Sequence, residues 1–296
     1  MNLIRSLLFW IWFNGSILVV GTLGAPYVLL SKTGGSFVME TWARVAAFGA
    51  RWICGIKTEV RGLEHLPDGP VMIASKHQSA FDTVAPILFT KRPVYVLKQE
   101  LLDMPIFGWY CQRAGLIAID RDGHMSALRK LIAQAKERFA DGRPLIIFPE
   151  GTRQDIGADP DYKSGVAGIY TMLGVPCVPM ALNTGLVWPA KGFMRYPGTA
   201  VFEFLPVIPA GLKRAEFMAT LEDRIETASN ALRAQGRNAV RVKNVSVTDT
   251  PASNSQESSV SPALISSGKG RSDEEGHGIS DGDRGSDSGS DGGGTD

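Results

Sequence analysis

The sequence predicts an α/β fold in which a mostly parallel sheet is flanked by helices and preceded by a membrane-associated pair of helices. Three observations support this prediction. An uncharged apolar segment opens the chain, short apolar runs alternate with helical stretches after residue 62, and polar residues cluster directly after two of those runs. Such alternation is typical of a sheet covered by helices. The 296 residues are enough for a domain with a buried core.

The first segment is apolar over a length that can cross a bilayer. Residues 6–30 contain no charged side chain, and about 20 helical residues span the hydrocarbon core. A cleaved signal peptide is the alternative, but its apolar region covers only about 7–15 residues before a small-residue cleavage site. Trp10, Trp12 and Asn14 fit that pattern poorly. We therefore expect a membrane anchor.

A second, amphipathic helix is expected over residues 36–53. Its apolar residues recur at helical spacing, and its charged residues fall on another face. The pattern predicts a helix at the membrane interface, with Trp42 and Trp52 at headgroup depth. Packing of this helix on the soluble domain is the alternative, and one helix could do both. Residues 1–55 are thus expected to form a membrane-anchoring helix pair.

The body of the chain, residues 56–244, is expected to form the α/β domain. Its predicted strands are residues 71–74, 94–97, 116–119, 145–148, 177–182 and 201–204. Its predicted helices begin near residue 80 and cover residues 126–139, 164–173 and 212–232. Functional groups in such sheets collect beyond the carboxyl ends of the strands. Both polar clusters, residues 75–82 and 149–153, lie there.

Residues 245–296 are expected to form a disordered acidic tail. Ser, Gly and Asp dominate this segment, and its apolar surface is too small to offset the entropy of ordering it. It holds ten acidic and three basic residues, so the whole-chain charge of +1 leaves about +8 on residues 1–244. A basic body suits an anionic membrane, a phosphate-bearing substrate or a nucleic acid, and the sign alone does not distinguish them.

The three cysteines, Cys54, Cys111 and Cys177, show neither CxxC pairing nor metal-ligand spacing. We expect them to be free thiols that act as small core residues in a reducing compartment. No metal site is expected. The sequence also contains no H-E-x-x-H, Walker A or strand-linked G-x-G-x-x-G motif, which argues against metalloenzymes and nucleotide-binding proteins.

His77 and Asp82, in an H-x-x-x-x-D run, are the candidate catalytic pair. Histidine can remove the proton of an alcohol near neutral pH, and a carboxylate on its second ring nitrogen fixes the tautomer. Residues i and i+5 of one helix do not face each other. The pair therefore requires His77 on a loop and Asp82 in the first turn of the next helix. A helix-start carboxylate beside an ordinary loop histidine is the alternative. The other histidines, His65, His124 and His277, occupy less suitable contexts.

A second polar cluster follows the strand predicted at residues 145–148. Its residues Glu150, Gly151, Thr152 and Arg153 can present backbone N–H groups and a guanidinium to a phosphate. A tight turn with an exposed arginine is the alternative.

These clusters resemble motifs of the glycerolipid acyltransferase family. Residues 76–82 look like its first motif, 115–121 like its second, 148–153 like its third and 175–179 like its fourth, in the family's order. The first motif commonly begins with Asn. This chain has Lys76 there, so the local hydrogen bonding must differ.

The resemblance implies roles for individual residues. His77 would be the general base and Asp82 its orienting partner. The glycerol phosphate would be held by Glu150, Gly151, Thr152, Arg153 and, from the second motif, Arg121. Lys98 and Lys163 are further basic candidates near this phosphate, and the alternative for each is a solvated surface lysine.

Within the family the chain is most similar to bacterial enzymes that acylate lysophosphatidic acid. This implies direct acyl transfer to the sn-2 hydroxyl from acyl-CoA or acyl–acyl carrier protein as co-substrate, with no cofactor. The sequence lacks a G-x-S-x-G elbow for a covalent intermediate. The expected location is the inner (cytoplasmic) membrane, with the catalytic domain facing the cytoplasm, the bilayer as partner and no nucleic acid. The alternatives are another acceptor such as lyso-ornithine lipid, a lipid esterase, or a non-enzymatic lipid-binding protein.

Overall fold

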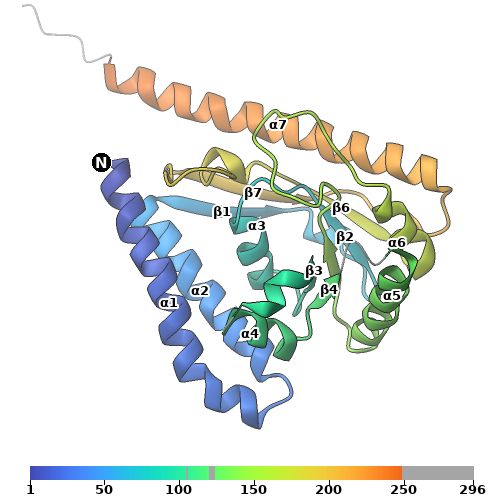
Figure 1. Ribbon diagram of the computed structural model, residues 1–296. Coiled ribbons are helices and arrows are strands. Elements are labelled where there is room, and N and C mark those ends of the chain that lie inside the picture. Colours follow the sequence, from blue (N-terminus) through green and yellow to red (C-terminus); the bar gives the residue numbers. More distant parts are fainter. Residues whose placement is uncertain (105, 120–123, 249–296) are drawn as a thin grey trace, which may run out of the picture. The chain divides into compact units, whose positions relative to one another are not determined.

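A computed structural model describes residues 1–104, 106–119 and 124–248 of the chain. Figure 1 shows the arrangement of its helices and strands. The strands are β1 (Ile56–Arg61), β2 (Met72–Ser75), β3 (Val94–Lys98), β4 (Ile117–Ile119), β5 (Leu145–Ile147), β6 (Cys177–Leu182) and β7 (Gly198–Phe204). The α-helices are α1 (Asn2–Leu30), α2 (Gly34–Cys54), α3 (Phe81–Val84), α4 (Phe107–Arg113), α5 (His124–Ala140), α6 (Gly165–Leu173) and α7 (Arg214–Thr248). The 3-10 helices are η1 (Leu63–His65), η2 (Ala85–Leu88), η3 (Gln99–Asp103) and η5 (Thr184–Leu186).

All seven strands belong to one sheet, in the order β1-β7-β6-β2-β5-β3-β4. Strands β6, β2, β5, β3 and β4 are parallel to one another. β7 is antiparallel to β6, and β1 is parallel to β7. The prediction of a mostly parallel sheet is therefore confirmed. Every residue of the central strand β2 is buried, as expected for a parallel strand covered on both faces.

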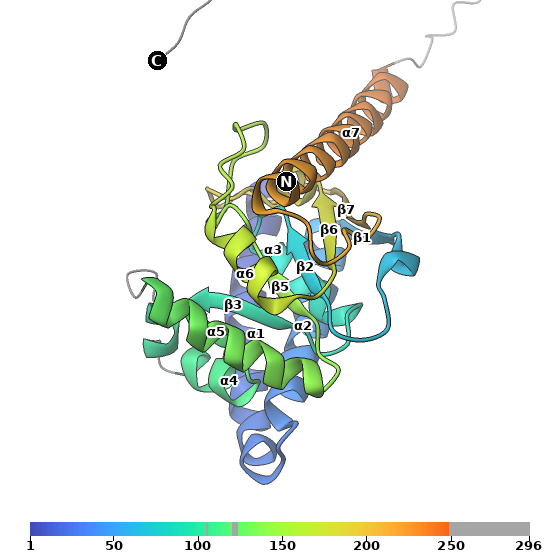
Figure 2. The same ribbon diagram turned by 90° about the vertical axis from the view of Figure 1, so that its right-hand side faces the viewer.

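Helices cover both faces of this sheet, which gives the domain three layers (Figures 1 and 2). The side chains of β2 alternate between the two cores. Ile73 packs in a cluster with residues of α1, α2 and α3, including Phe9, Ala46 and Phe81. Met72 and Ala74 pack in a second cluster with residues of α5, α6 and α7, including Leu131, Ile169 and Phe217.

Helix α1 leaves much of its apolar surface uncovered. It is the one helix in the described part of the chain that is long and apolar enough to cross a membrane. Its 29 residues extend roughly 43 Å at the rise of an α-helix. Only 17% of its most apolar window is buried, and its exposed residues include Leu7, Ile11, Leu18 and Leu30. The composition and exposure of α1 fit a membrane-associated helix.

Helix α2 has two apolar faces, in agreement with both alternatives weighed for it. Ala46 and its neighbours pack on the domain, whereas Phe48 and Trp52 are exposed. Trp52 thus lies where an interfacial residue is expected. Trp42 does not, because it faces α1 and packs edge-on against Phe13, with 5.3 Å between the ring centroids.

The three cysteines are buried free thiols, which confirms their predicted place in the core. The last helix is longer than predicted. Helix α7 continues to Thr248, whereas the predicted helix ended at residue 232. Residues 237–248 contain neither Gly nor Pro, so the sequence offers no breaker there. The predicted tail falls mostly on residues 249–296, which lie outside the described residues.

Candidate active site

The loop between β2 and α3 brings His77 and Asp82 together. The loop residue His77 donates from Nδ1 to Oδ2 of Asp82, at 3.1 Å. Asp82 lies in the first turn of α3. The same oxygen accepts the backbone N–H groups of Gln78 and Ser79, at 2.6 and 2.8 Å. These contacts are the arrangement expected from the five-residue spacing.

A threonine from a distant segment completes the environment of Asp82. The hydroxyl of Thr184, in η5, donates to Oδ1 of Asp82 at 2.6 Å. Both side chains are fully buried. The carboxylate therefore receives four hydrogen bonds where water is excluded, which stabilises its charge and fixes its orientation.

One face of the His77 imidazole is packed against another ring, and one of its nitrogens has no hydrogen-bond partner among the described residues. Its ring stacks on Phe148, with the centroids 4.0 Å apart and an interplanar angle of 18°. About 13% of the side chain is accessible. Nδ1 is occupied by Asp82, and no described residue hydrogen-bonds to Nε2. Nε2 is therefore the nitrogen that can take a proton from a substrate.

A buried charge network lies beneath this loop. Lys76 Nζ contacts Glu150 Oε1 at 2.8 Å and Glu226 Oε1 at 2.6 Å. The hydroxyl of Tyr162 also donates to Glu226, at 2.9 Å. Burial raises the pKa of Glu150, and Lys76 opposes that shift. Burial and the Glu226 carboxylate raise the pKa of Tyr162 as well.

Glu150 connects the network to the catalytic loop. Its Oε2 accepts the backbone N–H of His77 at 2.9 Å, and its side chain is fully buried. The carbonyl of His77 accepts the N–H of Gln154 at 2.8 Å. Both polar clusters of the sequence thus meet at one edge of the sheet. Glu150 contacts protein groups through both oxygens, and its expected contact with substrate stays a prediction.

The turn after Glu150 presents the rest of the second cluster. Gly151 has φ +66°, a conformation that favours glycine, and its N–H bonds to the carbonyl of Phe148 at 3.0 Å. Thr152 and Arg153 are exposed at this turn. Arg153 is therefore accessible to a ligand, which fits both the predicted phosphate contact and the alternative of an exposed arginine at a tight turn.

A second arginine lies within electrostatic range of Arg153. The guanidinium of Arg195 sits 4.6 Å above the ring centroid of Trp188, and its Nη1 donates to two backbone carbonyls. Its Nε is buried without a hydrogen-bond partner among the described residues. Burial lowers the pKa of Arg195, and Arg153 contributes to that shift. The two cations therefore lie close enough to interact electrostatically.

Among the described residues, Lys98 and Lys163 form no side-chain hydrogen bond or ion pair with the dyad. Lys98 and Lys163 are more than half exposed and pair with Glu100 and Asp161, each at 2.5 Å. Arg121 lies outside the described residues. In the described part of the chain, no group of three or more His, Cys, Asp or Glu side chains is arranged to hold a metal ion.

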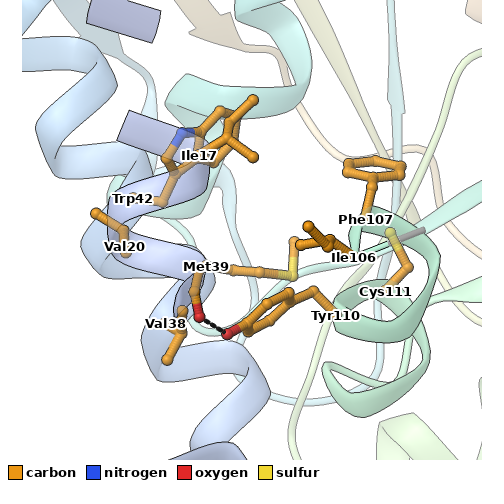
Figure 3. Close-up of a pocket in the computed structure, with 10 residues that line it drawn as sticks. Ile17, Val20, Val38, Met39, Trp42, Ile106, Phe107, Tyr110 and Cys111 are labelled. Carbon is orange, nitrogen blue, oxygen red and sulfur yellow. Dashed lines mark hydrogen bonds between the residues drawn. The ribbon is translucent and has the colours of Figure 1, made fainter. Parts of the chain in front are cut away.

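An apolar pocket lies between the helix pair and the start of α4. Figure 3 shows side chains of α1, α2 and α4 converging on it, with the hydroxyl of Tyr110 bonded to the carbonyl of Gly21. Its lining consists of Ile17, Val20, Gly21, Val38, Met39, Trp42, Ile106, Phe107, Tyr110 and Cys111. A chain of aromatic contacts links Trp42 through Phe13 and Trp188 to Phe81, the neighbour of Asp82. The pocket therefore borders the same apolar layer as the dyad.

Comparison with known proteins places the chain in a family. A family model described as Acyltransferase matches residues 57–183. The 1-acyl-sn-glycerol-3-phosphate acyltransferase of Pseudomonas aeruginosa is 38% identical over 226 residues, which cover 75% of this chain and 88% of that protein. The chain belongs to this acyltransferase family.

More distant relatives agree with this membership. The human 1-acyl-sn-glycerol-3-phosphate acyltransferase alpha is 28% identical to this acyltransferase over 217 residues, covering 72% of the chain and 76% of the human protein. The crystal structure of the 1-acyl-sn-glycerophosphate (LPA) acyltransferase PlsC from Thermotoga maritima matches with a TM-score of 0.66. It is 22% identical and covers 79% of this chain and 96% of that one, so the two share a fold.

Four residues around the site of this acyltransferase were not predicted from the sequence: Tyr162, Thr184, Arg195 and Glu226. Thr184 follows β6 at the catalytic edge of the sheet, so its position could have suggested a role. Tyr162, Arg195 and Glu226 carried no such signal. Both Thr184 and Glu226 lie beyond the residues that the family model matches.

Proposed function

We propose that this protein transfers a fatty acyl group from a thioester to the sn-2 hydroxyl of lysophosphatidic acid, which yields phosphatidic acid. The observation that carries the proposal is the His77–Asp82 pair, whose buried carboxylate orients a ring with Nε2 left open. Relatives named as 1-acyl-sn-glycerol-3-phosphate acyltransferases supply the substrate class.

The proposed reaction uses His77 first as a base and then as an acid. Nε2 of His77 takes the proton of the acceptor hydroxyl while the hydroxyl oxygen attacks the carbonyl carbon of the thioester. The tetrahedral intermediate then collapses, the C–S bond breaks, and the thiolate leaves with the proton from the imidazolium. Asp82 stabilises the imidazolium in between. Such acid–base help contributes about 10²–10⁴-fold, and positioning of the two substrates supplies much of the rest.

The positive region at Arg153 and Arg195 is proposed to hold the phosphate of the acceptor. Guanidinium groups suit phosphate because they offer several donors in a fixed plane. Glu150 and Lys76 have a different role in this proposal. They are buried beneath the loop, and their contacts position the backbone of His77.

The apolar pocket of Figure 3 is proposed to accept an acyl chain. The pocket opens beside α1, whose apolar surface is exposed, so a lipid could enter the pocket from a membrane. The donor is proposed to be acyl-CoA or acyl–acyl carrier protein, both of which present the acyl group as a thioester. We further propose that the domain faces the cytoplasm from the inner membrane, where both donors occur.

The test compares wild type with His77→Ala and Arg153→Ala in detergent. Matched controls are His65→Ala and Arg129→Ala, which change the same residue types away from the site. Each protein receives an acyl thioester with lysophosphatidic acid, other lysophospholipids or lyso-ornithine lipid. We expect His77→Ala to lose at least about 10²-fold in kcat. Arg153→Ala should raise KM for the phosphate-bearing acceptors more than for lyso-ornithine lipid.

Three results would count against the proposal. Full activity of His77→Ala would end the mechanism. A wild type that prefers the phosphate-free acceptor would end the substrate assignment. Release of free fatty acid without any acceptor would favour a lipid esterase.

A further inference from the structure

A basic cavity lies at the amino-terminal ends of the parallel strands, away from the dyad. Its volume is about 370 Å³, and its lining includes five cations and one acid: Lys32, Arg92, Arg113, Arg138, Arg143 and Asp141. Arg92 and Arg143 precede β3 and β5, whereas His77 and Glu150 follow β2 and β5. Because these strands are parallel, the cavity and the dyad lie at opposite ends of the strands. We call this cavity the distal basic pocket.

Two guanidinium groups of the distal basic pocket are held in place by the main chain. Arg143, only 7% exposed, donates from Nε to the carbonyl of Arg92 at 2.9 Å and from Nη2 to that of Ala114 at 2.7 Å. Arg138 donates from Nε to the carbonyl of Gly115 at 3.1 Å. These bonds leave Nη1 of Arg143 without a hydrogen bond among the described residues. The cations are therefore pre-positioned.

Gly115 provides the space between the two arginines. It has φ +70°, and a Cβ there would lie 2.9 Å from Nη1 of Arg143 and 3.0 Å from Nε of Arg138. A side chain at this position would therefore be strained and would crowd both guanidinium groups. The glycine keeps both groups close to the chain and close to each other.

The charge of the pocket is only partly balanced, because its lining holds one acid, Asp141, against five cations. Of the five cations, only Arg138 forms an ion pair among the described residues, with Glu137 at 4.0 Å. Burial lowers the pKa of Arg143 to about 10; Arg138 and Arg92 add to that shift, and Asp141 opposes it. Arg113 and Arg138 end helices, where the dipole favours a cation. That effect explains single cations at helix ends, but not five around one cavity.

We propose that the distal basic pocket binds a phosphate group, supplied either by an anionic phospholipid headgroup or by free phosphate. Fixed guanidinium groups with unused donors match phosphate oxygens. The surroundings favour the lipid. Leu29 and Leu30, just before Lys32, are 63% and 86% exposed, and Phe37 on α2 is 58% exposed. A phospholipid with its phosphate in the pocket would lay its acyl chains along this apolar surface. This site does not depend on the proposed function.

The test uses the full chain and two charge-matched double variants. Lys32→Gln/Arg113→Gln removes two pocket cations that form neither ion pairs nor hydrogen bonds with the described residues. Arg44→Gln/Arg51→Gln removes two cations from α2 outside the pocket. Flotation with vesicles of phosphatidylcholine, with or without phosphatidylglycerol, measures lipid binding. Thermal unfolding in inorganic phosphate or in chloride of equal ionic strength measures binding of free phosphate.

We expect the pocket variant to lose roughly tenfold or more of its affinity for phosphatidylglycerol vesicles, and the α2 variant clearly less. Binding to pure phosphatidylcholine should be the same for all three proteins. If inorganic phosphate also raises the wild-type Tm, and the pocket variant loses that rise, free phosphate suffices as ligand. Equal losses in both variants, together with no phosphate effect on wild type, would overturn the proposal. If the double variant fails to fold, the same comparison is made with Lys32→Gln alone, and the same two outcomes apply.

Discussion

The exchange Asp82→Asn removes the charge beside His77 and keeps the shape of the side chain. The amide oxygen can still accept from Gln78, Ser79 and the imidazole, and the amide nitrogen would then face the hydroxyl of Thr184. The imidazolium that forms during transfer would lose its counter-charge. With 3.1 Å between Nδ1 and Oδ2, the two charge centres are about 4 Å apart, which is worth about 4 kcal/mol at an effective dielectric constant near 20.

That energy corresponds to about three powers of ten in rate, since each 1.36 kcal/mol is about tenfold. The amide dipole retains part of it, so we expect kcat to fall about 10²–10³-fold. The KM for lysophosphatidic acid should change little, because Asp82 is fully buried. Initial rates of thiol release from the acyl thioester measure both constants.

The matched control is Asp155→Asn, because Asp155 is about half exposed and pairs with Lys191 at the surface. Such a pair contributes about 0–1 kcal/mol, so this variant should behave as wild type. A folded Asp82→Asn protein whose kcat is within about threefold of wild type would refute the electrostatic role of Asp82.

The remaining predictions concern buried groups around the loop and one buried thiol on α4. Thr184→Val should cost about 1.5–3 kcal/mol of unfolding free energy by denaturant titration, because it leaves Oδ1 of Asp82 without a donor; Thr184→Ser should recover most of it. Lys76→Met should cost about 3–5 kcal/mol by leaving Glu150 unpaired, and adding Glu150→Gln should restore stability. Burial already raises the pKa of Glu150 above its unfolded value of 4.5. In Lys76→Met the folded protein therefore binds a proton at Glu150 more tightly than the unfolded chain does. The unfolding free energy of this variant should rise as the pH falls towards 4.5. Finally, burial raises the pKa of Cys111 to about 12, so iodoacetamide at mildly alkaline pH should label it only on unfolding; rapid labelling of the folded protein would contradict this.

Much of the sheet could be predicted because its strands are short apolar runs between polar loops. The strands β2 to β6 match the predicted runs within one or two residues. β1 was missed because it lies at the sheet edge and is largely exposed, so residues such as Lys57 and Glu59 conceal its pattern. The short helix α4 was missed as well, since it is too short to show a clear period.

The residues of the site likewise fall into those that could be predicted from the sequence and those that could not. His77, Asp82 and Glu150 could be found because they follow strands, and strand ends share one edge of a parallel sheet. Glu226 could not, because it reaches Lys76 from α7 and no local pattern marks a helix charge that points inward. The same holds for Arg195, whose place above Trp188 depends on tertiary packing.

The bond between Lys76 and Glu226 joins residues that are 150 positions apart in the sequence. This separation sets the order in which the parts of the site are synthesised. The chain emerges from the ribosome N-terminus first, so the histidine loop is made long before the helix that fixes it from below. Helix α1, with its exposed apolar surface, is synthesised earlier still. A nascent chain therefore exposes the apolar surface of α1 before its histidine loop is complete. The loop gains its contact with Glu226 only when α7 has been synthesised and has docked, so a chain truncated before α7 would lack that support beneath Lys76.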